Sequence, residues 1–411
     1  MREQLASATT RAVNAASRRL GRGQGTVAGG RAGLRIDSRL LEHLSAGRQV
    51  VLVTGTNGKT TTTRLVTVAL AVHGDSVVSN ETGSNMPPGH VAALAGNHSP
   101  KAVLEVDESY LPRVLTATSA QAVVLLNLSR DQLDRTSEVR MVAGRWRAAL
   151  AAAPRAQVIA NADDPLVVWG AGAARTVHWV AAGLRWRLDA VGCPSCEGRI
   201  AFAEGTWSCQ DCGFARPEPE TNLVIQDDGS ALGVWTDGRS LPIRLVLPGR
   251  FNQANALMAA VAAEACGVAA ADALRAMEEV DHVAGRFTVR TFGDRRARLM
   301  LAKNPAGWDE LLDLVSAGDV PLVVSINART ADGTDPSWLW DVPYERLSGR
   351  SVVATGDRFR DLSERLRYDG VAHRTEPEPR QAVMLSGDGT EATVEVIGNY
   401  TAFHDLLEAP A

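Results

Sequence analysis

The chain has 411 residues, and its 43 lysines and arginines against 47 aspartates and glutamates give a formal net charge of −4. This length allows two or three domains, and this charge excludes a general attraction to nucleic acid. Hydrophobic residues make up 45% of the chain, an ordinary share for a soluble protein, and no apolar run approaches the ~20 residues that span a bilayer.

Residues 1–48 form a short segment before the first predicted strand. Residues 1–23 are basic but lack an apolar stretch, so we expect no secretory signal. We expect a solvated amphipathic helix packed on the body of the protein. The alternative is a helix that touches an anionic surface through Arg11, Arg18 and Arg19. The few cysteines, mostly in C-x-x-C pairs, favour a reducing, cytoplasmic location.

Residues 49–290 have the pattern of a central nucleotide-binding domain. A strand, a glycine turn and a helix occupy 48–74, and further short apolar runs follow at 102–107, 122–128, 157–161 and 176–180. Helical stretches such as 139–153 separate these runs. Short buried strands that alternate with helices predict an α/β fold with a mostly parallel, doubly wound sheet.

Beyond residue 180 the chain contains an insertion, the end of the central domain and then a second domain. Antiparallel strands and a helix at 252–268 follow a cysteine-containing insertion at about 185–222. A junction at 281–290 comes next. Residues 291–411 then restart the β/α alternation, which predicts a smaller, Rossmann-like α/β domain at the C-terminus.

The segment "GTNGKTT" follows a strand and opens a helix, as a phosphate-binding loop requires. Its residues are Gly55, Thr56, Asn57, Gly58, Lys59, Thr60 and Thr61. The glycines let backbone N–H groups approach phosphates, Lys59 would reach the β- and γ-phosphates of ATP, and the Thr60 hydroxyl would hold Mg²⁺. Val53 stands where the longer G-x-x-x-x-G-K-[ST] pattern has its first glycine. The alternative is a glycine-rich turn without a ligand.

Four of the five cysteines have the spacing C-x₂-C, twelve residues, C-x₂-C. They are Cys193, Cys196, Cys209 and Cys212. This spacing predicts a ribbon that holds Zn²⁺ with four thiolates, a closed and therefore structural site. Four unmetallated thiols are the alternative. Residues 193–213 contain one basic residue against three acidic ones, so nucleic-acid binding by the ribbon is not expected.

The phosphate loop resembles the ATP loop of the Mur ligases and folylpolyglutamate synthetases, and other segments support the resemblance. "LEVDES" places Glu105, Asp107 and Glu108 after a strand, where the family has a Mg²⁺-binding glutamate. We assign that role to Glu108, with Glu105 as the second candidate. A helix-capping acidic cluster is the alternative.

Four further segments are similar to elements of this family, in the family's order. "NLSRDQLDR" contributes Asn127, Asp131 and Asp134, but has Gln132 where the family often has a second metal-binding His. The other three segments contribute Asn161 and Asp164 near the nucleotide, Asn252 and Asn255 with Asn255 as the adenine contact, and Arg286 near ATP. Phe251 replaces a common His. Lys303 resembles a family position, or is a solvated turn lysine.

The short N-terminal segment, the four-cysteine insertion and residues 331–345 resemble one branch of the family, the MurT-type subunits of lipid II isoglutaminyl synthase. This resemblance implies that ATP phosphorylates the α-carboxylate of D-Glu in the lipid II stem peptide. Ammonia then attacks the acyl phosphate and gives D-isoglutamine. It also implies action in the cytoplasm, at the inner face of the plasma membrane.

The fifth cysteine, Cys266, lies in an alanine-rich segment that we expect to be a buried helix, so it is a poor candidate for a glutaminase nucleophile. The resemblance therefore implies a separate class I glutaminase subunit of the GatD type, bound to the C-terminal domain. In this branch the synthetase is expected to lend an Asp to the partner's Cys–His pair. We assign Asp335, with Asp332 and Asp341 as alternatives; all three are equally compatible with capping roles.

Two other functions remain compatible with the sequence. One is a folylpolyglutamate- or cyanophycin-type ligase that adds an amino acid. The other is a non-catalytic nucleotide-binding protein that binds a partner, which the departures at Gln132 and Phe251 keep open.

Overall fold

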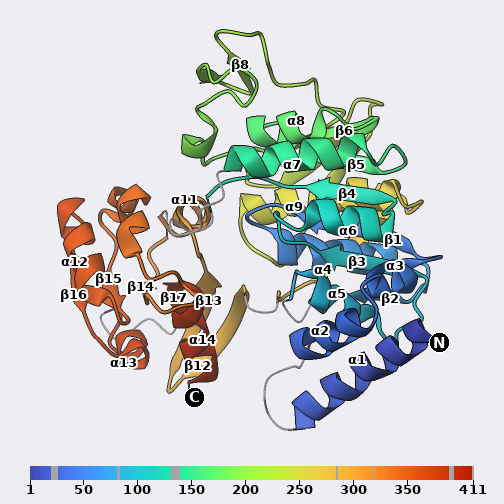
Figure 1. Ribbon diagram of the computed structural model, residues 1–411. Helices are drawn as coiled ribbons and strands as arrows, with labels where there is room; N and C mark the ends of the chain where they lie inside the picture. Colours follow the sequence, from blue (N-terminus) through green and yellow to red (C-terminus); the bar gives the residue numbers. More distant parts are fainter. Residues whose placement is uncertain are drawn as a thin grey trace. The chain divides into compact units, whose positions relative to one another are not determined.

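A nine-stranded sheet organises the N-terminal part of the molecule (Figure 1). Its strand order is β11-β10-β9-β6-β5-β4-β1-β3-β2. The computed structural model describes residues 1–19, 26–80, 84–130, 139–283, 286–316, 318–387 and 393–409. They form two units, Met1–Leu128 with Ser137–Asp281, and Ser129–Thr136 with His282–Ala411.

In the order of the sheet, all neighbouring strands from β2 at one edge to β9 pair in parallel. Within this sheet, the antiparallel pairs are β9 with β10 and β10 with β11. The predicted mostly parallel sheet is therefore confirmed. The strands are β1 Gln49–Thr54, β2 Val77–Ser79, β3 Lys101–Glu105, β4 Ala122–Leu125, β5 Gln157–Asn161, β6 Thr176–Ala181, β9 Thr221–Ile225, β10 Ala231–Trp235 and β11 Ser240–Ile243.

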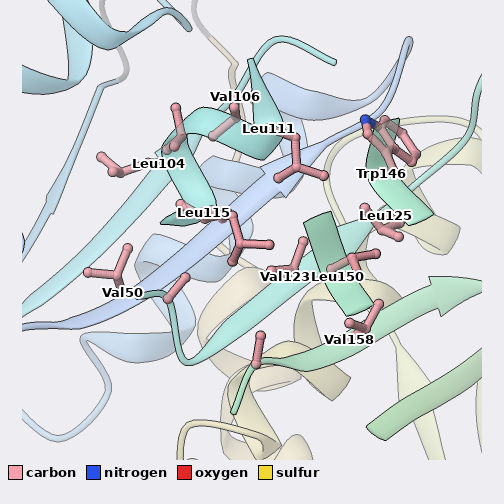
Figure 2. Packing of buried hydrophobic residues seen from close by; sticks show 14 of the residues in the cluster. Val50, Leu104, Val106, Leu111, Leu115, Val123, Leu125, Trp146, Leu150 and Val158 are labelled. Atoms are coloured by element: carbon pink, nitrogen blue, oxygen red, sulfur yellow. The ribbon is translucent and has the colours of Figure 1, made fainter. Parts of the chain in front are cut away.

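Helices cover both faces of this sheet, which is why its strands are continuous apolar runs. On one face lie α4 Lys59–Leu70, α9 Arg250–Glu264 and α10 Ala270–Met277. On the other lie α5 Pro87–Leu94, α6 Leu111–Thr118, α7 Val139–Ala151 and α8 Pro165–Ala171. Figure 2 shows the core on this second face, where Leu104 and Val123 of the sheet pack with Leu111, Leu115 and Leu150 of the helices.

The N-terminal helices are α1 Arg2–Arg19, α2 Thr26–Ile36 and α3 Leu40–Ser45. Helix α1 buries Ala6, Thr10 and Asn14 and packs on α2, as expected for a helix packed on the body. A Cβ on Gly29 would lie 1.9 Å from Asn14 Oδ1, so the glycine permits this close approach.

The ribbon is inserted between β6 and β9. It contains a short helix, Leu188–Ala190, and a separate hairpin of β7 Ile200–Ala203 and β8 Thr206–Cys209. The antiparallel strands expected after it are β9 to β11, which extend the main sheet.

The second unit has its own six-stranded sheet, in the order β12-β13-β17-β14-β15-β16, parallel except for β12. The predicted smaller α/β domain is confirmed. Its strands are β12 Phe287–Phe292, β13 Arg295–Leu301, β14 Leu322–Ser325, β15 Val352–Thr355, β16 His373–Thr375 and β17 Thr393–Gly398. Its helices are α11 Pro305–Ser316, α12 Phe359–Tyr368, α13 Pro379–Met384 and α14 Tyr400–Glu408, with 3₁₀ turns η2 Pro336–Asp341 and η3 Tyr344–Leu347.

Candidate active site

The candidate site residues of the first unit follow the carboxyl ends of neighbouring parallel strands. Strand β1 lies between β3 and β4. After β1 the chain forms β2 and β3 on one side of β1, and then crosses to form β4 on its other side. The carboxyl ends of parallel strands meet at one edge, and such a switch point is where open α/β sheets bind ligands. The segments after β1, β3, β4 and β5 therefore converge there.

The phosphate loop after β1 has a backbone that only glycine accommodates well. Gly58 precedes α4 with φ 83°, and a Cβ on it would lie 2.7 Å from Asn255 Oδ1. Gly55 has φ 141°, and its Cβ would lie 2.9 Å from the Cβ of Leu126. The loop thus presents bare backbone at the N-terminus of α4, where the helix dipole favours an anion. Thr60 and Thr61 lie in the first turn of that helix.

Lys59 is almost fully buried, with 3% of its side chain exposed. Its Nζ donates to the carbonyl oxygens of Gly55 at 2.6 Å and Thr56 at 3.1 Å. It also lies 3.1 Å from Oε2 of Glu108, which follows β3. The lysine assigned to the phosphates and the carboxylate assigned to Mg²⁺ are therefore adjacent. A loop with glycines at positions 55 and 58, the Lys59 ammonium and the Glu108 carboxylate together fit a magnesium–nucleotide complex.

Glu108 and Glu105 occupy different environments. The carbonyl oxygen of Glu108 accepts a 2.8 Å hydrogen bond from the buried indole of Trp146, labelled in Figure 2. The carboxylate of Glu105 instead receives Asn85 Nδ2 at 3.3 Å, with only 6% of the residue exposed. The contact with Lys59 supports Glu108 as the choice between the two.

The backbone of Glu105 is held from two sides. Asn80 accepts from its N–H at 2.8 Å and donates to its carbonyl at 2.9 Å, and His90 Nε2 lies 2.8 Å from the same carbonyl. His90 is fully buried, and this burial lowers its pKa to about 4, so the ring is neutral and donates from Nε2.

Asn127, after β4, binds the phosphate loop through three hydrogen bonds. Its Oδ1 accepts from Asn57 N at 2.9 Å, its Nδ2 donates to Asn57 O at 3.0 Å, and its backbone carbonyl accepts from Thr56 N at 3.0 Å. This clamp fixes the loop's conformation. The rest of the predicted motif, Asp131, Gln132 and Asp134, lies outside the described residues.

Asn161 and Asp164 shape the turn after β5. Asn161 donates to Gly183 O at 3.0 Å and accepts from Asp163 N at 3.0 Å. Asp164 caps α8 by accepting from Leu166 N, and also accepts from Leu128 N at 2.8 Å. Its complete burial raises its pKa to about 6. Both side chains are thus engaged within the protein.

Asn252 and Asn255 lie in the first turns of α9 and are buried. Asn252 Nδ2 donates to Pro248 O at 2.6 Å, whereas Asn255 faces Gly58 of the phosphate loop. Asn255 therefore belongs to the site, and its adenine contact stays a prediction.

The four ribbon cysteines come together: their Sγ atoms all lie within 4.8 Å of one another. Cys193 and Cys212 are 3.7 Å apart, and Cys196 and Cys209 are 3.5 Å apart. Thiolates bound tetrahedrally at ~2.3 Å from zinc are about 3.8 Å apart, so the arrangement fits that metal. The backbone N–H of Asp211 lowers the pKa of Cys209 to about 7, whereas burial raises the pKa of Cys193, so the lowered pKa belongs to one thiol and not to the whole cluster.

The remaining cysteine, Cys266, was expected inside a buried helix, but it lies in the turn after α9. It is half-buried, and burial raises its pKa to about 11. The thiolate that a nucleophile requires is therefore disfavoured.

The three candidate aspartates belong to the second unit and differ in their contacts. Asp332 is buried and accepts from Thr401 N and Oγ1. Asp341 lies 3.7 Å from Arg130. Asp335 is exposed at the start of η2, where its hydrogen bond from Ser337 N lowers its pKa. Asp335 is thus the most accessible carboxylate of the three.

The tryptophans of η2 have different positions. Trp338 is 7% exposed and stacks on Trp308, with ring centroids 6.2 Å apart. Trp340 is 56% exposed and contacts the exposed ring of Tyr368 at 5.4 Å. Trp338 is therefore a core residue, whereas Trp340 and Tyr368 form an exposed aromatic pair. Arg286 and Lys303 also belong to this unit: Arg286 directly precedes β12, and Lys303 precedes α11.

Two protein-family models match the sequence. The family model of the Mur ligase middle domain matches residues 53–181, and the family model of the MurT ligase C-terminal domain matches residues 301–403. The MurT subunit of lipid II isoglutaminyl synthase (glutamine-hydrolyzing) from Streptococcus pneumoniae is 28% identical and covers 94% of this chain and 92% of its own. The same subunit from Staphylococcus aureus is 29% identical, covering 99% and 98%. The chain thus contains segments that match a Mur ligase middle domain and a MurT ligase C-terminal domain. Its resemblance to the MurT branch is confirmed.

Solved structures agree with this Mur ligase assignment at the level of the fold. A pseudomurein peptide ligase type C from Methanothermus fervidus superposes with a TM-score of 0.69 at 18% identity, covering 90% of this chain and 81% of that one. Folylpolyglutamate synthase from Mycobacterium tuberculosis gives 0.62 at 16%, covering 90% and 93%. The named relatives are ligases and synthase subunits, and the phosphate loop of this chain is consistent with an ATP-dependent ligase.

Several residues of this chain that support the site were not found from the sequence. Asn80, His90 and Trp146 hold the backbone of Glu105 and Glu108, but each is far from its partner along the chain. No local pattern identifies such pairs.

Among the described residues, no helix combines the length and hydropathy needed to cross a membrane.

Proposed function

We propose that this protein amidates the α-carboxylate of D-Glu in the lipid II stem peptide, producing D-isoglutamine. The carboxylate attacks the γ-phosphorus of ATP, and ADP leaves. Ammonia then attacks the acyl phosphate, a C–N bond forms, and inorganic phosphate leaves. The observation that carries this proposal is the Lys59–Glu108 pair beside a bare phosphate loop, in a chain similar over nearly its whole length to MurT subunits.

The residues of the first unit support the phosphoryl-transfer half of this reaction. Backbone N–H groups of Gly55–Gly58 and the Lys59 ammonium would bind the β- and γ-phosphates, with Asn127 holding the loop in place. Thr60 and Glu108 would bind Mg²⁺, which neutralises phosphoryl charge when bound. Phosphoryl transfer depends mainly on such positioning and charge stabilisation, since the transition state needs little covalent chemistry from the protein.

The ammonia would come from a second chain, a class I glutaminase subunit of the GatD type. Four of the five cysteines form the ribbon cluster, and the pKa of Cys266 is raised by burial. The exposed Asp335, near the Trp340–Tyr368 aromatic pair, would orient the catalytic His of that partner. Exposed aromatic rings are common anchors of protein interfaces. The enzyme would act in the cytoplasm, on lipid II at the inner face of the plasma membrane.

The proposal is tested by assaying lipid II amidation with the purified chain, alone and with its glutaminase, using glutamine or ammonium as donor. We expect ATP-dependent amidation with ammonium from the chain alone, with glutamine only from the pair, and with neither donor after Lys59→Ala. A wild-type chain that makes no product with either donor would contradict the proposal. Addition of a free amino acid to a substrate would instead support the folylpolyglutamate-type alternative.

A further inference from the structure

The four-cysteine ribbon contacts the turn that follows β5 in the nucleotide-binding unit. Trp207, on β8, is 2% exposed, and its indole N–H donates to the carbonyl oxygen of Ala162 at 3.0 Å. Ala162 lies between Asn161 and Asp163 in that turn. The ribbon therefore holds one backbone group of the candidate site directly.

A second contact joins the same two segments. Arg216, which follows the last ribbon cysteine Cys212, lies 2.7 Å from Asp163 Oδ1, and both side chains are largely buried. The other carboxylate oxygen of Asp163 accepts from Gly183 N at 2.6 Å. The backbone N–H of Arg216 in turn donates to the carbonyl of Trp207 at 3.0 Å. The two contacts thus act on one turn from one side.

The turn is linked onward to the phosphate loop. Asp164 Oδ2 accepts from Leu128 N at 2.8 Å, and the residue before Leu128 is Asn127. Asn127 makes two side-chain hydrogen bonds to Asn57 in the phosphate loop. Buried or half-buried hydrogen bonds, joined by the backbone from Ala162 to Asp164 and from Leu128 to Asn127, therefore connect Trp207 to the loop that would bind ATP.

The position of Trp207 depends on the cysteine cluster. Strands β7 and β8 form a sheet of only two strands, and an isolated hairpin of this size is marginally stable in water. Cys209 follows Trp207 by two residues, and its N–H donates to Phe214 O at 2.6 Å. Phe214 packs on the Trp207 ring, with centroids 5.1 Å apart. A metal bound by the four cysteines would hold this arrangement together.

We propose that the ribbon positions the turn after β5, so that metal in the four-cysteine site raises the affinity of the phosphate loop for nucleotide. Trp207 is the positioning residue that transmits this effect. The inference rests on the proposed nucleotide binding at Gly55–Thr61. Because coupling between two binding sites is reciprocal, nucleotide must raise the ribbon's affinity for metal by the same factor.

The test measures binding of a non-hydrolysable ATP analogue with Mg²⁺ to the zinc-loaded full chain. Trp207→Phe keeps the aromatic packing on Phe214 but removes the N–H donor, and we expect the analogue's Kd to rise about fivefold, as for one buried hydrogen bond. Trp235→Phe is the matched control, since Trp235 also donates its indole N–H, to Glu264 at 3.0 Å, outside this series. Its Kd should stay that of the wild type, and both variants should keep their zinc.

Zinc removal provides a test that needs no substitution. A zinc-selective chelator, with Mg²⁺ in excess, should raise the analogue's Kd in the wild type but add little in Trp207→Phe. The analogue should also slow the chelator's extraction of zinc from the wild type and not from Trp207→Phe, a result that a purely structural metal would not give. Hydrogen exchange of the Leu128 amide, the donor to Asp164, should speed up after zinc removal.

Three outcomes are decisive. An increase in Kd on zinc removal that Trp207→Phe abolishes supports the inference. A wild type that binds the analogue equally with and without zinc overturns it and leaves the proposed function intact. A wild type that binds no analogue in either state contradicts nucleotide binding itself, and the inference falls with it.

Discussion

Nζ of Lys59 lies 3.1 Å from Oε2 of Glu108, and the two residues follow different strands, β1 and β3. Only 3% of the lysine side chain and 14% of the glutamate side chain are exposed. Removing one member of such a pair leaves an uncompensated buried charge, whereas the intact pair keeps both groups charged. The pair thus holds an ammonium and a carboxylate ready at the mouth of the phosphate loop.

Lys59→Ala should abolish most ATP-dependent ligation. The variant loses the positive charge that would stabilise the transferring phosphoryl group, and removal of one such donor costs about 10²- to 10³-fold in rate. The measurement is the rate of ATP-dependent product formation. Lys101→Ala is the control, because Lys101 pairs with Asp75 at the amino end of β3, the end opposite the loop. Equal activities of the two variants would contradict the role of Lys59.

Gly58→Ala should weaken nucleotide binding more than it weakens the fold. Gly58 and Gly74 share a φ of 83°, so an alanine costs about 1–2 kcal/mol of backbone strain at either position. Only at Gly58 would the new Cβ meet another group, Asn255 Oδ1 at 2.7 Å, whereas nothing lies within 4 Å at Gly74. We therefore expect a larger loss of unfolding free energy in Gly58→Ala than in Gly74→Ala, and a loss of nucleotide affinity in Gly58→Ala alone, measured by calorimetry.

The sequence predicted those features whose signals are local. The apolar runs gave the strands, and the glycine–lysine spacing gave the phosphate loop. Side chains decide where some elements begin: α11 starts at Pro305, because Asn304 Oδ1 accepts from Gly307 N. The apolar run at 122–128 ends as a strand at Leu125, since the next residues turn to clamp the loop.

The supporting contacts could not be predicted, because each joins segments far apart in the chain. Trp146 and Glu108 are 38 positions apart, and Trp207 and Ala162 are 45 apart. Their residue types suit any core, and only the packing of α7 and the ribbon against the sheet brings them to their partners. The motif identified the chemistry of the site, while tertiary structure decides what holds it.

His90→Gln should reduce the loss of stability in acid. The pKa of His90 falls from 6.5 to about 4 on folding, so the unfolded chain binds the proton more tightly. The contribution of neutral His90 to the free energy of unfolding is fully present above pH 6.5. As the pH falls toward 4, the free energy of unfolding decreases by about 3 kcal/mol. Gln keeps a donor for the Glu105 carbonyl but does not titrate.

Urea unfolding between pH 4 and 7.5 checks this prediction. Asp164 acts in the opposite direction: its pKa, raised to about 6, gives stability that is present below pH 4 and lost as the pH rises through 6. The difference between His90→Gln and the wild type isolates the histidine. His73→Gln, at an exposed position, is the control. Parallel pH profiles for all three proteins would refute the assignment.

Cys209→Ser should release the ribbon metal and lower the unfolding temperature. A tetrathiolate site that loses one thiolate binds zinc much more weakly, and structural zinc contributes directly to folding stability. Metal content by mass spectrometry should fall from one zinc per chain in the wild type to a small fraction in the variant. Cys266→Ser, which removes the cysteine outside the cluster, should keep its zinc. Unchanged zinc in Cys209→Ser would rule out a four-thiolate site.

Asp335→Asn should separate the use of glutamine from the use of ammonium. Asp335 would orient the partner's catalytic His. An asparagine at this position leaves the fold of η2 intact, but its side-chain amide favours the wrong His tautomer, at a cost of up to ~10⁴-fold in glutaminase rate. Amidation with ammonium should continue at the wild-type rate, because that reaction bypasses the glutaminase. The comparison requires both donors, assayed on the same complex.

Asp361→Asn is the matched control for this substitution. Asp361 is also an exposed carboxylate of the second unit, paired with Arg358 at 2.9 Å, and its loss should leave both donors equally effective. Asp332 is unsuitable as a control, since its bonds to Thr401 make it part of the fold. Equal losses with glutamine and ammonium in Asp335→Asn would mean a structural role, and no loss with either would transfer the assignment to Asp341, which is also partly exposed.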